Sequence, residues 1–83
     1  MAEQKLLTLT ISRVDGPVSN GEVVSVSVPG AQGEMQILAQ HEALISPLKK
    51  GKIVIGKTND ETETFEIESG TLEISNNHAT ILI

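Results

Sequence analysis

Residues Pro29–Gly51 read PGAQGEMQILAQHEALISPLKKG, and this stretch decides between an all-β chain and one that contains a helix. Six of its residues are spaced i, i+1, i+4, i+7, i+8 and i+11, as on one face of a helix; they are Ile37, Leu38, His41, Leu44, Ile45 and Leu48. By local rules alone, this spacing predicts a helix from about Met35 to Ser46. Pro47 is the one objection, because proline would break the last turn.

The same stretch also fits two strands joined by a loop. Gly33 would then be a turn residue, and Met35 and Ile37 would alternate with polar neighbours. A loop at Ala39–Ala43 would lead to the next strand. The residues themselves leave both interpretations open.

On either side of this stretch, short runs alternate apolar and polar residues, which is typical of half-buried strands. Turn-forming Gly, Pro and Asn separate these runs, and Asn76-Asn77 predicts a tight hairpin because Asn tolerates positive φ. About seven or eight such strands are expected, and each must bury one apolar face. This requirement predicts two packed sheets or a flattened barrel. We expect residues 1–83 to form one domain, with the lone aromatic residue, Phe65, near the middle of its core.

Composition argues against several classes of function. Eleven acidic residues against six basic ones give a net charge of −5, which disfavours nucleic-acid binding. There is no Cys, and the two His residues have no catalytic or zinc-binding partners at a recognisable spacing. We therefore expect no catalysis, no cofactor and no metal. No run approaches the length of a membrane span, so contact with a membrane would need a partner.

A family resemblance enters through two parts of the chain. Val24–Ile37 reads VSVSVPGAQGEMQI and is followed by His41 and then by Leu44–Gly51. Together with the closing hairpin Ser69–Leu82, this order of residues resembles the N-terminal domain of the epsilon subunit of F-type ATP synthases. In mitochondria that subunit is called delta. The shared pattern is a strand, a Gly-Glu turn, a short strand, a His in a loop, two apolar residues, and a Gly before the next strand. The resemblance favours the strand interpretation and implies an all-β sandwich of about eight to ten short, mostly antiparallel strands.

This chain departs from the family pattern in three places. The family usually has Gly-His-Ala-Pro-Leu around the histidine, whereas Gln40 and Glu42 flank His41 here. Gln36 stands where the family often has Gly, so it would be strained if the backbone needs positive φ there. The family continues into a C-terminal helical hairpin that can restrain ATP hydrolysis, and we expect a chain ending at Ile83 to lack it.

The resemblance implies a non-catalytic rotor subunit of the central stalk. Such a subunit couples rotation of the c-subunit ring to the gamma subunit and the catalytic head. It would be a monomer when isolated, and peripheral on the cytoplasmic face of the bacterial inner membrane through the complex. By position, the ring-facing residues would be Glu34, Met35, His41 and Glu42, and the gamma-facing residues would be Ser12, Ile45 and Ser46.

Plain structural roles compete with these assignments. Glu34 would otherwise be an ordinary exposed turn acid, and His41 would be a partly buried histidine bonded to the backbone. The alternative function is a free-standing β-sandwich adaptor that recognises a protein by edge pairing.

Overall fold

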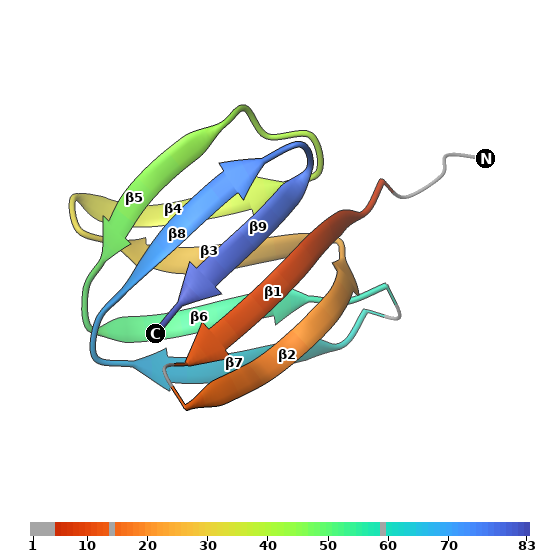
Figure 1. The fold of residues 1–83 in the computed structure, drawn as a ribbon. Helices are drawn as coiled ribbons and strands as arrows, with labels where there is room; N and C mark the ends of the chain where they lie inside the picture. Colours follow the sequence, from red (N-terminus) through yellow and green to blue (C-terminus); the bar gives the residue numbers. More distant parts are fainter. Residues whose placement is uncertain (1–4, 14, 59) are drawn as a thin grey trace.

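The computed structural model describes residues 5–13, 15–58 and 60–83, and its secondary structure is entirely β (Figure 1). The strands are β1 (Leu7–Arg13), β2 (Gly16–Val23), β3 (Ser25–Gly30), β4 (Gly33–Leu38), β5 (Leu44–Leu48), β6 (Gly51–Gly56), β7 (Thr62–Ile67), β8 (Gly70–Ser75) and β9 (His78–Leu82). The helix that local spacing predicts from Met35 to Ser46 is absent, and β4 and β5 occupy that stretch. The all-β prediction and its strand number are confirmed.

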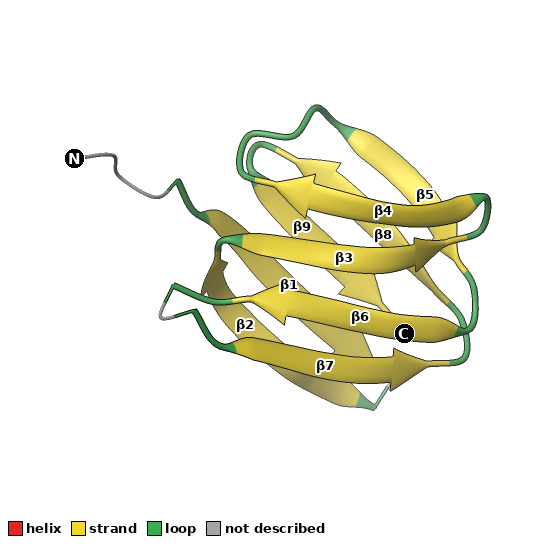
Figure 2. Ribbon diagram, turned by 180° about the vertical axis from the view of Figure 1, so that it is seen from behind, coloured by secondary structure: helices red, strands yellow, loops and turns green. Residues whose placement is uncertain are grey.

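The strands form one continuous sheet that folds over on itself (Figure 2). One layer has the order β2-β1-β9-β8-β5, here called the five-strand layer, and the other has the order β7-β6-β3-β4, here called the four-strand layer. A single bridge, Gly30 to Leu48, joins the layers through β3 and β5. Neighbouring strands are antiparallel except β1 and β9, which are parallel.

The core between the layers is aliphatic. Its buried side chains are Leu7, Leu9, Ile11, Val23, Val26, Val28, Ile37, Leu48, Ile53, Ile55, Ile67, Leu72, Ile74, Ala79 and Ile81. No polar or charged side chain is buried among the residues that the structure describes. Candidate functional residues therefore lie on the surface, and the core serves to hold that surface rigid.

Phe65 is not at the centre of this core, contrary to the sequence-based expectation. It lies on β7, which is an edge strand next to β6, and its ring is partly buried against the cluster. Its register partner is the fully buried Ile53. An edge strand has a packed neighbour on one side only, so its side chains keep contact with solvent.

Two asparagines form the tight hairpin between β8 and β9. Asn76 and Asn77 have φ of 52° and 60°, and Ser75 pairs directly with His78 across the turn. The predicted two-residue turn is confirmed.

Candidate protein-interaction surface

A groove of about 440 Å³ runs along one side of the sandwich between β4 and β5, and we call it the β5 groove. It is lined by residues 30–35 of the β3–β4 turn and early β4, and by residues 44–47 of β5. Met35 and Leu44 are partly buried against the core at this place. The groove exists because β4 and β5 are the outermost strands of their layers and diverge from the Gly30–Leu48 bridge.

Four of the seven predicted site residues meet at the β5 groove. Glu34 and Met35 line one wall, and Ile45 and Ser46 line the other. The residues expected to face the ring and those expected to face gamma are therefore neighbours. The sequence did not indicate this, because β4 and β5 share no ladder pairs.

His41 and Glu42 lie elsewhere. They belong to the loop after β4, at the opposite end of that strand from Glu34 (Figure 2). A strand of six residues spans roughly 17 Å from first to last at about 3.3 Å per residue. The four residues expected to face the ring are thus divided between the two ends of β4.

Ile45 and Ser46 point to opposite faces of β5, because successive side chains alternate along a strand. Ile45 is 70% exposed, whereas Ser46 is half-buried. The Ser46 hydroxyl donates to the carbonyl oxygen of Pro47 at 3.2 Å. The Ile45 side chain therefore lies on the outer face of the five-strand layer and the Ser46 side chain on the inner face, although both residues border the groove.

The outer face of the five-strand layer carries a second exposed apolar side chain, Leu82, which is 54% exposed. The parallel register sets Leu82 beside Ser12 on β1, and the antiparallel register sets it beside Thr71 on β8. Ser12 itself is separated from β5 by β9 and β8. Leu82 is hard to single out from sequence because it lies in the unbroken apolar run Ile81–Ile83, where only the period of two shows that it points outward.

The loop that holds His41 is fixed by local and distant hydrogen bonds. His41 is half-buried, and its Nδ1 lies 2.8 Å from the carbonyl oxygen of Glu42. The Gln40 N–H donates to Asn77 Oδ1 at 2.7 Å. This arrangement matches the expected histidine bonded to backbone.

The backbone strain considered for Gln36 does not occur at that residue. Gln36 is a regular β4 residue, and the positive φ of 64° is found at Gln40, where the family usually has Gly. A left-handed conformation costs about 1–2 kcal/mol for most residues, although glycine also loses more chain entropy on folding.

We therefore expect Gln40→Gly to raise the free energy of unfolding by about 0.5–1 kcal/mol, because the strain that glycine relieves outweighs the extra chain entropy that it loses on folding. Urea unfolding of the purified protein measures the change. Gln36→Gly is the matched control and should instead destabilise by about 0.5–1 kcal/mol, because it lies inside a strand. A loss of stability in Gln40→Gly would contradict the strain argument.

The described residues contain neither a cluster of metal-binding side chains nor a membrane-spanning helix. No group of three or more His, Cys, Asp or Glu side chains is arranged to hold a metal ion in the part of the chain that the structure describes. The same residues include no helix long and apolar enough to cross a bilayer.

Comparison with known proteins identifies the family to which this domain belongs. Residues 6–83 match the β-sandwich domain of the ATP synthase delta/epsilon chain. The chain belongs to this family. The resemblance seen in the sequence is thereby confirmed, and it extends over the whole fold described above.

Relatives named ATP synthase epsilon chain differ in how much of their length this domain spans. The Sulfurimonas denitrificans protein is 36% identical over 77 residues, which are 93% of this chain and 59% of that relative. The Protochlamydia amoebophila protein is 39% identical over 77 residues, 93% of this chain and 52% of that relative. The Chlorobaculum tepidum protein is 35% identical over 81 residues, 98% of this chain and 92% of that relative. The chain therefore spans little more than half of some epsilon chains and nearly all of another.

Solved structures share the fold. A chain of the Euglena gracilis mitochondrial ATP synthase (OSCP/F1/c-ring) superposes with a TM-score of 0.87 at 20% identity, covering 99% of this chain and 52% of that chain. A chain from the central stalk and c-ring of the Tetrahymena thermophila mitochondrial ATP synthase superposes with a TM-score of 0.79 at 14% identity, covering 98% of this chain and 65% of that chain. At such low identity the likeness establishes the β-sandwich fold alone.

Proposed function

We propose that this chain is a rotor subunit of the central stalk of an F-type ATP synthase. It would join the c-subunit ring to the gamma subunit and pass rotation to the catalytic head without catalysing a reaction or holding a cofactor. Family membership over residues 6–83 carries the proposal. The aliphatic core supports it as well, because a joint that bears torque needs a rigid module with its contacts on the outside.

The ring contact is proposed for the β3–β4 turn. Glu34 is exposed at the start of β4, and Met35 lies next to it in the β5 groove. By the family resemblance, the loops of the ring carry basic residues, so an acidic turn offers electrostatic complementarity. His41 and Glu42 lie at the other end of β4, which is too far away for the same short loop to reach.

The gamma contact is proposed for the outer face of the five-strand layer. Ile45 and Leu82 supply exposed apolar area there, and Ser12 lies beside Leu82. Apolar anchors surrounded by polar residues are typical of protein interfaces. Bound in this way, the chain would be peripheral on the cytoplasmic face of a bacterial inner membrane, reaching it only through the complex.

Glu34→Lys should weaken binding to the purified c-subunit ring roughly tenfold at low salt, because reversing the charge replaces attraction by repulsion. Glu22→Lys is the matched control, because it involves the same change of charge at another exposed position. Glu22 lies near the end of β2, where β2 pairs with the start of β1. Surface plasmon resonance on immobilised chain gives both affinities, and thermal unfolding checks that both variants fold. Equal binding by wild type and Glu34→Lys would count against a ring contact at this turn.

The adaptor alternative predicts different partners. If the chain binds neither ring nor gamma when both are supplied pure, the rotor proposal fails and the adaptor function becomes the better explanation.

A further inference from the structure

The folded-over sheet leaves two lateral openings where the outermost strands of the layers do not pair. β2 and β7 border one opening, and β4 and β5 border the other (Figures 1 and 2). Within residues 5–13, 15–58 and 60–83, β2 pairs only with β1, β7 only with β6, and β4 only with β3, whereas β5 pairs with β8 and meets β3 at one bridge. Unpaired strand edges attract other strands, so proteins usually protect them with charge, proline or bulges.

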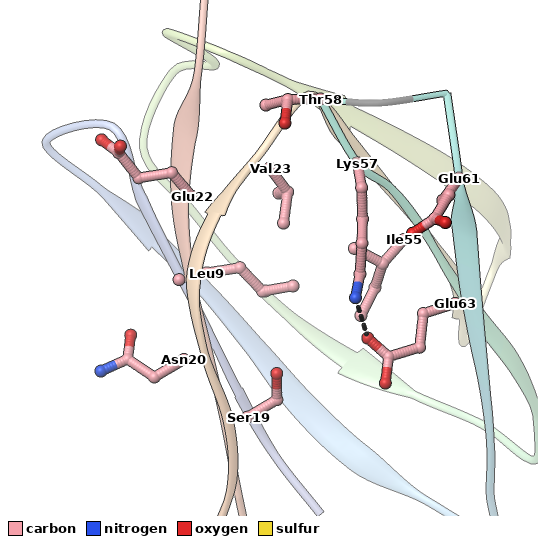
Figure 3. A pocket seen from close by; sticks show the side chains of 11 residues that line it. Leu9, Ser19, Asn20, Glu22, Val23, Ile55, Lys57, Thr58, Glu61 and Glu63 are labelled. Atoms are coloured by element: carbon pink, nitrogen blue, oxygen red, sulfur yellow. Dashed lines mark ion pairs between the residues drawn. The ribbon is translucent and has the colours of Figure 1, made fainter.

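The opening between β2 and β7 is protected by charge. The Lys57 Nζ lies 3.0 Å from Glu63 Oε1 at its rim, and Glu22 and Glu61 add two more charged groups (Figure 3). The β1–β2 register also shifts between Ile11 and Ser12. An incoming strand would have to displace these charges, so this edge is a poor template.

The opening between β4 and β5, the β5 groove, has less protection. Its one proline on β5, Pro47, lies next to the bridge between Gly30 and Leu48 and does not occupy the strand edge at Ile45. Among the described residues that line it, Glu34 alone is charged. β5 reads LISPL, with no charged residue, and its Ile45 is 70% exposed. The groove therefore combines an apolar lining with a strand edge that is open for pairing.

The backbone of β5 is oriented for pairing on this side. The Ala31 N–H donates to the carbonyl oxygen of Pro47 at 3.0 Å, which shows that Pro47 directs its carbonyl group away from β8. Along a strand these directions alternate, so Ile45, two residues earlier, directs its N–H and C=O the same way. In the described ranges no strand pairs with Ile45 on that side.

We propose that an extended segment of the gamma subunit enters the β5 groove and adds a strand at Ile45. This inference rests on the rotor function proposed above. An added strand would continue the five-strand layer whose outer face carries Ile45 and Leu82, so the groove and the proposed gamma-facing surface form one continuous interface. The segment would lie along the β5 wall of the groove and direct an apolar side chain toward Leu44, which leaves Glu34 and Met35 on the β4 wall to the ring contact proposed above.

Amide hydrogen exchange of the wild-type chain, with and without purified gamma, tests the pairing directly. We expect the Ile45 amide to exchange at least about tenfold more slowly in the complex, because it gains a hydrogen bond there. If gamma binds and the Ile45 amide is unchanged, the strand addition is wrong while the rotor function stands. If gamma does not bind, the strand addition fails, and if the ring does not bind either, the rotor function fails as well.

Two variants of Ile45 separate backbone pairing from side-chain contact. Ile45→Thr keeps the N–H and the β-branched shape, whereas Ile45→Pro removes the N–H at a position where proline is tolerated because the edge faces outward. We expect Ile45→Pro to bind gamma about tenfold more weakly than Ile45→Thr, the equivalent of one lost hydrogen bond. Equal binding of gamma by the two variants, both folded, would overturn the proposal. If Ile45→Pro does not fold, the hydrogen-exchange experiment on the wild-type chain tests the proposal instead.

Other occupants of the groove give different results. Protection of the Ile45 amide by the purified c-subunit ring, but not by gamma, would assign the groove to the ring and overturn the proposal. A dimer of the isolated chain in sedimentation velocity, with the Ile45 amide protected in that dimer, would assign it to a second copy instead.

Discussion

Ile81→Ala is expected to lower the free energy of unfolding by about 3–4 kcal/mol. Ile81 is fully buried on β9, and the register sets it between Leu72 on β8 and Ile11 on β1, both fully buried as well. Removing three carbons there leaves a cavity that neighbouring strands cannot close without breaking their ladders. Small domains are stable by about 5–15 kcal/mol in all, so urea unfolding should show a large shift of the midpoint.

Two other substitutions locate the centre of the core. Phe65→Ala should cost less than Ile81→Ala, about 1–2 kcal/mol, because the Phe65 ring on edge strand β7 is only partly buried. Leu82→Ala, next in sequence to Ile81 but 54% exposed, should change stability by less than about 0.5 kcal/mol. A larger loss in Phe65→Ala than in Ile81→Ala would place the centre of the core at the aromatic residue.

The second large effect is expected at Asn77. Its Oδ1 accepts the Gln40 N–H at 2.7 Å, and its Nδ2 donates to the Leu6 carbonyl oxygen at 2.8 Å. Its backbone carbonyl oxygen also accepts the Thr8 N–H at 3.2 Å. One residue thus ties the hairpin between β8 and β9 to the start of β1 and to the loop that carries His41.

Asn77→Ala should cost about 2–3 kcal/mol, because it loses two side-chain hydrogen bonds and strains a residue at φ 60°. Asn77→Gly keeps the backbone conformation and should recover about 1 kcal/mol of that loss. Asn76→Gly is the control for the turn alone, and should change stability by less than about 0.5 kcal/mol. Urea unfolding gives the three values. The Gln40 amide should exchange faster in both Asn77 variants, and unchanged exchange would show that the bond to Asn77 does not hold the loop.

The sequence predicted much of the fold because burial in a half-buried strand alternates with a period of two. Leu7, Leu9 and Ile11 alternate with Thr8, Thr10 and Ser12 in the sequence, which is typical of a half-buried strand, and the structure buries all three. The Asn76-Asn77 turn was equally local, since two residues that tolerate positive φ determine its geometry. The same kind of reasoning predicted that Glu34 is exposed, and the structure places it second in β4, next to the turn.

The candidate surface was predicted only in part. Glu34 and Ile45 were both singled out from the family pattern, but their position on opposite walls of one groove depends on how β4 and β5 diverge. Leu82 was missed because the adjacent Ile81 and Ile83 mask its outward orientation. The strain considered for Gln36 belongs to Gln40, since the loop after β4, rather than β4 itself, needs the positive φ.

The sequence by itself determined the strands outside Pro29–Gly51, the turns between them and the apolar face of each strand, because these depend on neighbours within a few residues. Only the tertiary structure decided that Met35–Ser46 is not a helix, that Phe65 lies at an edge, and that one opening of the sandwich carries more charged side chains than the other. Those outcomes depend on pairings such as β3 with β6 and β5 with β8. Ladder hydrogen bonds and burial against strands that are distant in the sequence outweigh local helical propensity. A local sequence pattern therefore cannot predict these outcomes.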